Sequence, residues 1–167
     1  MRDDELQFSS DFESGNLDMA VQIGENEYDL FLRVDSNTGG YTGWFYFEVS
    51  NTRRNQKVRF NILNMTKTES PYGRGMRINY WSKRGNHSAF QGWQLGAHEI
   101  KYARTKTLKN EEARRKFMTL SFDFTFTCDR DHVWLAYTIP YTYSMLTQYL
   151  KAVQTEQKLV KEKTERA

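Results

Sequence analysis

The sequence of 167 residues has one cysteine, three histidines and no long apolar run. Cys128 cannot form a disulfide within the chain, and this favours a reducing compartment. No stretch approaches the roughly 20 apolar residues that a membrane-spanning helix needs. Residues 1–18 have neither a basic start nor a hydrophobic segment, so no signal peptide is expected. Together these absences predict a cytoplasmic protein without a membrane partner.

Motifs of the common enzyme classes are missing as well. The chain has no Gly-rich phosphate loop, no His-Glu-x-x-His, no Gly-x-Ser-x-Gly and no Cys-x-x-Cys. His87, His98 and His132 fall on separate expected elements, whereas a catalytic zinc ion needs about three protein ligands that converge on it. No catalytic, cofactor-binding or metal-binding residue is therefore predicted in this chain.

Strand-like alternation of apolar and polar residues dominates the chain. A chain of this length is expected to be one domain that buries about 70% of its unfolded surface. The strongest alternation runs through residues 43–64, which we expect to form one antiparallel hairpin. Its inward-facing apolar residues are Phe45, Phe47, Val49, Val58, Phe60 and Ile62. Residues 51–56 between the two arms are polar and basic, which predicts an exposed, positively charged tip.

Further strands are expected at residues 17–23, 28–34, 77–83, 118–126 and 132–139, with a short edge strand around Trp93 and Leu95. Residues 6–15 are expected to be an irregular lead-in, and residues 105–116 a charged loop or a short helix. Because the strands follow one another without intervening helices, we predict an all-β fold, an antiparallel β-sandwich of seven to nine strands over residues 1–140. The expected core residues are Phe45, Phe47, Phe60, Ile62, Leu120, Phe122 and Phe124.

The period changes after Pro140. From Thr142, a candidate N-cap, apolar residues recur at helical spacing, so residues 141–167 are predicted to form one C-terminal helix. No glycine or proline closes this helix, and we expect it to connect the sandwich to another domain. The residues expected to make that interdomain contact are Tyr141, Tyr143, Leu146, Tyr149 and Leu150.

Charge is distributed unevenly along the chain. Residues 1–50 carry a net charge of −9, whereas residues 51–84 carry +8. Either acidic and basic strands neutralise each other locally, or the basic segment forms a surface for an acidic partner. The residues predicted to bind acidic tails are Arg53, Arg54, Lys57 and Arg59. The acidic first 50 residues and the lack of a recognition motif argue against nucleic acid as a partner.

Aromatic residues are abundant, at 15% of the chain. Such a set is typical either of a platform for sugars or single-stranded nucleic acid, or of core and interface packing in a sandwich. Packing is the favoured interpretation. The residues concerned include Trp44, Tyr46, Tyr80, Trp81, Trp93 and Trp134.

Six segments in consistent order, within residues 6–150, resemble the amino-terminal domain of the cytosolic carboxypeptidases. They are FESGNL at 12–17, YDLFLRVD at 28–35, WFYFEVSN at 44–51, RFNI at 59–62, GM at 75–76 and PYTYS at 140–144. That family consists of zinc metallocarboxypeptidases that trim glutamates from tubulin and other acidic protein tails. The resemblance implies an antiparallel β-sandwich that stands immediately ahead of a catalytic domain.

The resemblance also implies what this chain does. The family's zinc ligands and catalytic glutamate lie in the following domain, and no position here matches them. The chain is thus expected to be a non-catalytic accessory domain without a cofactor of its own; zinc is expected only in the catalytic domain, which is absent from this chain. It would pack against that domain, support its folding, and shape the access of acidic tails such as polyglutamylated tubulin.

A stand-alone β-sandwich module that binds acidic peptides or proteins is the alternative. A large exposed apolar patch would favour the accessory domain, since such patches mark interaction sites. A closed, polar surface with the helix folded back on its own sheet would favour the stand-alone module.

Overall fold

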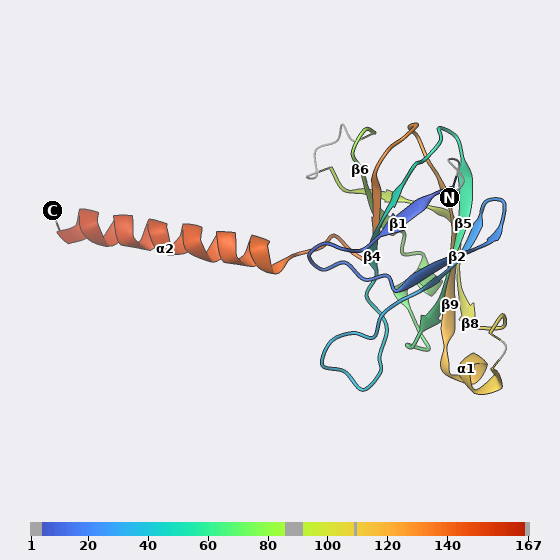
Figure 1. Cartoon of the computed structure of the whole chain (residues 1–167). Coiled ribbons are helices and arrows are strands. Elements are labelled where there is room, and N and C mark those ends of the chain that lie inside the picture. Colours follow the sequence, from blue (N-terminus) through green and yellow to red (C-terminus); the bar gives the residue numbers. More distant parts are fainter. Residues whose placement is uncertain (1–4, 86–91, 109, 166–167) are drawn as a thin grey trace.

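Two β-sheets packed face to face form the body of the protein, and a long helix points away from them (Figure 1). The structure is a computed structural model that describes residues 5–85, 92–108 and 110–165. Each sheet has five strands in this described part, and the two sheets enclose one hydrophobic core. The predicted all-β sandwich is therefore confirmed.

The first sheet is antiparallel throughout and has β10 at its centre. Its strands, in spatial order, are β1 (Gln7–Ser9), β4 (Tyr46–Ser50), β10 (Val133–Ala136), β6 (Ile78–Ser82) and β7 (Gln94–Gly96). The second sheet, in spatial order, contains β2 (Met19–Gly24), β3 (Glu27–Phe31), β5 (Lys57–Met65), β9 (Met118–Thr125) and β8 (His98–Arg104). The expected edge strand around Trp93 and Leu95 is thus present as β7.

The neighbours β3 and β5 are parallel, and this pair departs from the expected antiparallel arrangement. Two parallel neighbours need a long crossover connection, because the chain must return to the end from which it started. Here the crossover is built from β4, which lies in the opposite sheet. The chain leaves the second sheet after β3, contributes β4 to the first sheet, and returns to the second sheet as β5.

The prediction of one antiparallel hairpin over residues 43–64 is wrong, because its two arms, β4 and β5, belong to different sheets. Residues 51–56 form an arch between the sheets. Alternation correctly indicates that both arms turn their apolar face inward, but it does not tell whether they lie side by side or opposite each other. Phe47 on β4 and Phe60 on β5 meet across the core, with ring centroids 6.3 Å apart.

The arch is held by residues far along the chain. The Asn55 amide donates to the Phe126 carbonyl at 2.8 Å, and the Arg130 amide donates to the Thr52 carbonyl at 2.7 Å. Thr52 is buried, and its hydroxyl donates to the Cys128 carbonyl at 2.8 Å. These bonds join the arch to the connection between β9 and β10.

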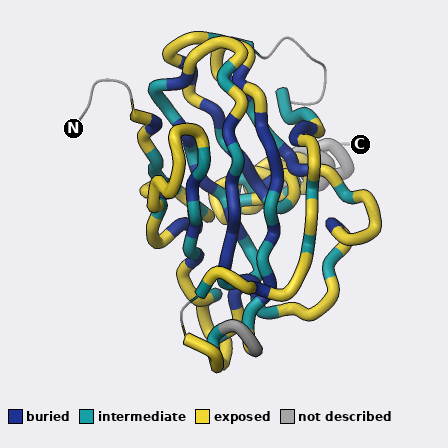
Figure 2. Tube along the Cα trace, turned by 90° about the vertical axis from the view of Figure 1, so that its right-hand side faces the viewer, coloured by how far each residue is buried: buried dark blue, intermediate teal, exposed yellow. Residues whose placement is uncertain are grey.

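All seven predicted core residues are buried. Six have no exposed surface, and Phe124 is 4% exposed. Buried positions gather in the middle of the body in Figure 2, while the segments around it are largely exposed. The alternation in the sequence therefore identified the inward face correctly.

The described residues contain ten strands, more than the expected seven to nine. The strand β1 lies within the expected lead-in, and β8 lies in a stretch without clear alternation because most of its side chains are exposed at the edge of the sheet. A short helix, α1 (Glu111–Lys116), forms where a loop or a helix was expected. A single 3₁₀ turn, Pro71–Arg74, interrupts the connection from β5 to β6.

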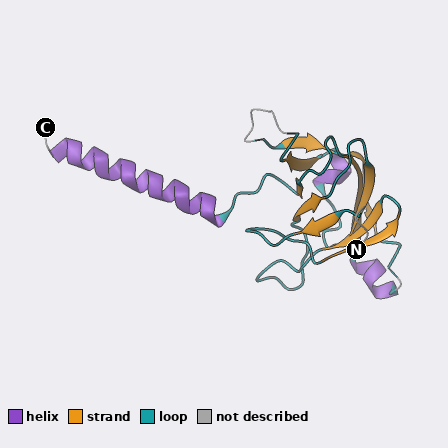
Figure 3. Ribbon diagram, turned by 45° about the horizontal axis from the view of Figure 1, so that its top comes forward, coloured by secondary structure: helices purple, strands orange, loops and turns teal. Residues whose placement is uncertain are grey.

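The C-terminal helix α2 (Tyr143–Glu165) confirms the change of period after Pro140. Thr142 acts as its N-cap, because the Thr142 hydroxyl accepts a hydrogen bond from the Met145 amide at 3.2 Å. The helix projects from the sandwich without folding back on it, as Figures 1 and 3 both show. In the described part of the chain, no helix is long and apolar enough to cross a membrane.

Candidate interdomain site

Large apolar side chains are exposed where the sandwich passes into α2. The five residues expected to contact another domain have exposed fractions from 38% for Leu146 to 75% for Tyr143. Val34 and Ile139, on neighbouring connections, are exposed as well. Exposed aromatic and aliphatic groups that gather in one region are typical of an interaction surface.

A cavity of about 650 Å³ opens beside this connection. Its walls come from residues 14–16 and residues 33–36, together with Trp44, Thr138, Ile139 and Tyr141. Both apolar groups, such as Val34 and Ile139, and polar groups line it. A protein segment that carries mixed side chains could therefore seat in it.

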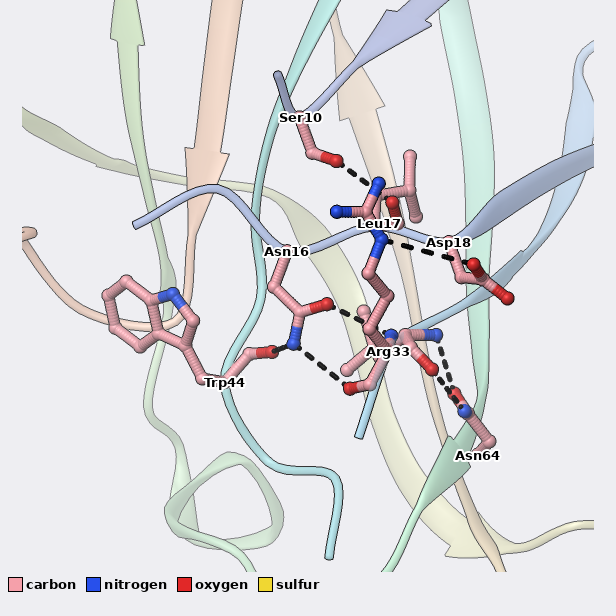
Figure 4. A network of polar contacts seen from close by, with 8 residues as sticks. Ser10, Asn16, Leu17, Asp18, Arg33, Trp44 and Asn64 are labelled. Atoms are coloured by element: carbon pink, nitrogen blue, oxygen red, sulfur yellow. Dashed lines mark hydrogen bonds and ion pairs between the residues drawn. The ribbon is translucent and has the colours of Figure 1, made fainter. Parts of the chain in front are cut away.

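Asn16 ties the walls of the cavity together (Figure 4). Its side-chain nitrogen donates to the Arg33 carbonyl at 3.1 Å and to the Trp44 carbonyl at 2.9 Å, and its side-chain oxygen accepts from the Arg33 amide at 2.9 Å. The amide group thus takes the place that a strand would have beside residue 33. Asn16 is only 7% exposed, so these bonds satisfy its buried polar atoms.

Asn64 bonds in the same way to Leu32, the residue that follows the end of β3 and precedes Arg33. Its side-chain oxygen accepts from the Leu32 amide at 2.9 Å, and its side-chain nitrogen donates to the Leu32 carbonyl at 2.8 Å. The two asparagines therefore satisfy the backbone of residues 32 and 33 after the regular strand has ended. These bonds hold in place the segment that leads from β3 to the cavity.

Glu13 fixes the start of α2 relative to this cavity. A carboxylate oxygen of Glu13 accepts a hydrogen bond from the Ser144 amide at 2.9 Å. This bond, the largest cause, lowers the pKa of Glu13 below its usual value. A carboxylate at the first turn of a helix also complements the helix dipole.

The four residues predicted to bind acidic tails lie in two places. Arg53 and Arg54 are exposed on the arch. The Arg54 backbone amide donates a hydrogen bond to the Asp129 carboxylate at 2.8 Å. Lys57 and Arg59 lie on the outer face of β5 and both pair with Asp123, at 2.9 Å and 2.7 Å. Local neutralisation therefore applies to Lys57 and Arg59, whereas binding of acidic tails by any of the four stays a prediction.

Metal-binding geometry is absent from the described ranges: no three His, Cys, Asp or Glu side chains lie together in a way that could hold an ion. His132 contacts the Glu48 carboxylate through its Nδ1 atom. His87 lies outside the described residues. That the chain binds no metal stays a prediction.

The sequence did not point to several residues of the site. Val34 and Ile139 were expected at the ends of strands, but β3 ends at Phe31 and β10 ends at Ala136. The turn-forming residues 35–40 and the proline after Ile139 were the available signals for these early ends. Asn16 carried no signal, because asparagine is common in any turn.

Comparisons with known proteins identify the family and agree with the fold. A model of the cytosolic carboxypeptidase N-terminal domain matches residues 8–138. The chain is 38% identical over 154 residues to cytosolic carboxypeptidase 3 of Bos taurus, and 39% identical over 151 residues to cytosolic carboxypeptidase 2 of Homo sapiens. These matches cover 92% and 90% of the chain but only 15% and 16% of the two relatives.

Solved structures show the same fold. A metallo-carboxypeptidase from Burkholderia cenocepacia superposes with a TM-score of 0.60 at 21% identity, over 90% of this chain and 34% of that one. A metallo-carboxypeptidase from Pseudomonas aeruginosa superposes with a TM-score of 0.54 at 15% identity, over 89% of this chain and 34% of that one. In both cases the likeness takes in about a third of the larger molecule.

Proposed function

The chain belongs to the cytosolic carboxypeptidase family, in which it corresponds to the N-terminal domain, and we propose that it is a non-catalytic accessory domain of a zinc carboxypeptidase. It packs against the catalytic domain, supports the folding of that domain, and works in the cytoplasm. The zinc ion and the catalytic glutamate belong to the partner domain. Polyglutamylated tubulin or other acidic tails are the substrates of the complete enzyme in this proposal.

The observation that carries the proposal is the exposed apolar connection between the sandwich and α2. Tyr141, which precedes α2, and Tyr143 and Tyr149, which belong to it, are each more than 60% exposed. The helix projects from the sandwich without folding back on it (Figure 1). Removing apolar surface from water contributes about 25 cal/mol per Å². A domain packed along this connection would therefore be stabilised chiefly by these side chains.

The cavity beside the connection supports the same proposal. Asn16 and Glu13 already fix its wall and the first turn of α2. A partner would bind a surface that needs little ordering, and less conformational entropy is lost when a surface is already ordered. The accessory domain can thus act as a template for the folding of its partner.

A stand-alone module for acidic peptides is the second candidate, and the exposed Arg53 and Arg54 support it. Two further cations that it would use, Lys57 and Arg59, are engaged by Asp123. The projecting helix also differs from the folded-back helix that a closed module would have. The accessory domain is therefore the better supported function.

Co-expression tests the proposal. The tagged chain, expressed with the catalytic domain of human cytosolic carboxypeptidase 2, should retain that domain on an affinity column and raise its soluble yield. Tyr149→Asp combined with Leu150→Asp should abolish retention, because charge would enter the apolar contact. Met19→Asp combined with Ile23→Asp is the matched control, since these β2 residues are similarly exposed but belong to a different part of the sandwich. Equal retention by both double variants would contradict the proposed interface.

A further inference from the structure

Three strands of the first sheet place a carboxylate and two indoles in one row on its outer face. Trp134 on β10 is the register partner of Glu48 on β4 and also of Trp81 on β6. The rings of Trp81 and Trp134 meet edge to face, with centroids 5.0 Å apart. Since all three side chains point away from the core, the outer face of the sheet presents both a carboxylate and aromatic rings.

Further aromatic rings close the row into a pocket. Tyr46 lies with its ring centroid 5.8 Å from that of Trp93 and 4.8 Å from that of Phe12. The resulting cavity of about 670 Å³, here named the tryptophan pocket, is lined by Phe12, Tyr46, Trp81, Trp93 and Trp134 together with Ser9, Asp11, Glu13 and Glu48. Three of the chain's four tryptophans therefore face one cavity.

The charge of the tryptophan pocket is negative. Asp11, Glu13 and Glu48 line it, and none of its described lining residues is lysine or arginine. Two of the carboxylates already have a partner: Glu13 accepts from the Ser144 amide, and Glu48 contacts His132, whose ring stacks on Trp134. Burial and the nearby Glu48 carboxylate raise the pKa of Tyr46, so its hydroxyl stays neutral.

We propose that the tryptophan pocket binds an organic cation, either an alkylammonium or a guanidinium group. Indole and phenol rings attract cations through the negative potential of their faces, and indole does so most strongly. The carboxylates add charge complementarity, and they repel the phosphates of a nucleic acid. The cation can be the basic side chain of a partner polypeptide or a free quaternary ammonium compound, which present the same chemistry.

Fluorescence of the full 167-residue chain tests this directly, because most of its tryptophans line the pocket. Choline and N-acetyl-arginine amide should each change the emission saturably at constant ionic strength. The neutral isostere of choline, 3,3-dimethylbutan-1-ol, should bind at least about tenfold more weakly, because it lacks the charge that the ring faces attract. Tighter binding of choline assigns the pocket to quaternary ammonium compounds, and tighter binding of the arginine amide assigns it to basic side chains. Equal binding of choline and its isostere, or no saturable change, would overturn the proposal.

Variants locate the binding. Trp134→Leu should weaken the binding of the preferred cation at least about tenfold, and Glu48→Gln by several fold, because each removes one source of attraction. Tyr41→Ala is the control, since Tyr41 is an exposed aromatic residue outside the tryptophan pocket, and the affinity of this variant for the cation should not change. Thermal unfolding of each variant shows whether it is folded, and Glu48→Gln keeps the size of the side chain. Unchanged affinity in both Trp134→Leu and Glu48→Gln would show that the cation binds elsewhere.

Discussion

Asn16 and Arg33 exchange two hydrogen bonds, one from the Arg33 amide to the Asn16 side-chain oxygen and one from the Asn16 side-chain nitrogen to the Arg33 carbonyl. A side chain here replaces the neighbouring strand. The backbone amide and carbonyl of Arg33 therefore have partners although this residue belongs to no strand (Figure 4). This amide group therefore helps to fix the wall of the cavity that opens beside the connection to α2.

Replacing Asn16 by Ala should lower the free energy of unfolding by about 1 to 3 kcal/mol, because buried backbone groups lose their partners. Urea denaturation followed by circular dichroism measures the change. Asp18→Asn is the control: its carboxylate lies 3.9 Å from Arg33 and both side chains are exposed, so its effect should stay below about 0.5 kcal/mol. Similar effects of the two substitutions would mean that Asn16 is not a structural clamp.

Phe60→Ala should cost about 3 to 5 kcal/mol of unfolding free energy, since the ring has no exposed surface and packs against Phe47 and Phe122. Chemical denaturation gives the value. Tyr143→Ala, at an exposed position, should change stability by less than about 0.5 kcal/mol. A cost below roughly 1 kcal/mol for Phe60→Ala would place this ring outside the core.

The purified chain should hold no stoichiometric zinc and release no glutamate from polyglutamylated peptides, because about three converging ligands are needed and none are expected here. Metal analysis after dialysis and a glutamate-release assay decide this. One retained equivalent of zinc, together with a glutamate release that chelation abolishes, would reverse the assignment as an accessory domain.

Polyglutamate should bind the arch weakly, with millimolar to high-micromolar affinity at low ionic strength, on the order of −4 to −6 kcal/mol. The attraction should fade near physiological salt, where the screening length is about 8 Å. Arg53→Glu combined with Arg54→Glu should abolish the binding measured by titration calorimetry. Lys57→Gln should change it little, because Lys57 is already paired with Asp123. Binding that resists both salt and the double substitution would exclude the arch as its site.

The first turn of α2 should loosen in acid. Because the folded-state pKa of Glu13 is lowered, the bond to the Ser144 amide is complete above the usual pKa of glutamate and is lost as the pH falls through the lowered value. The amide chemical shift of Ser144, followed by NMR below about pH 5, should report this titration. In Glu13→Gln the same resonance should lose its dependence on pH. A titration that persists in that variant must come from another group.

Phe47 and Phe60 show how far the sequence could predict this fold. Alternation records which side chains avoid water, so both rings were correctly expected in the core. It records nothing about which strands are neighbours, because a period of two is the same for a strand beside another and for a strand in the facing sheet. The hairpin was therefore predicted where an arch exists, and the parallel pairing of β3 with β5 was missed.

Prediction of the candidate site was limited in another way. The helical spacing of Leu146, Tyr149 and Leu150 predicted a helix, and α2 indeed exposes them. The cavity wall could not be predicted, since it depends on a side chain, Asn16, that bonds to residues 17 and 28 positions away. Contacts at such separations leave no periodic trace in a single sequence.

The central strand of the first sheet, β10, is also the last strand in the sequence. During synthesis on the ribosome, β4 and β6 must therefore wait with their facing edges unpaired until residues 133–136 have emerged. Topologies with such distant pairings fold slowly, and unpaired edges invite wrong association. The first sheet thus closes only after nearly all of the sandwich has been synthesised, just before α2, and the nascent chain is most vulnerable to misfolding shortly before that closure.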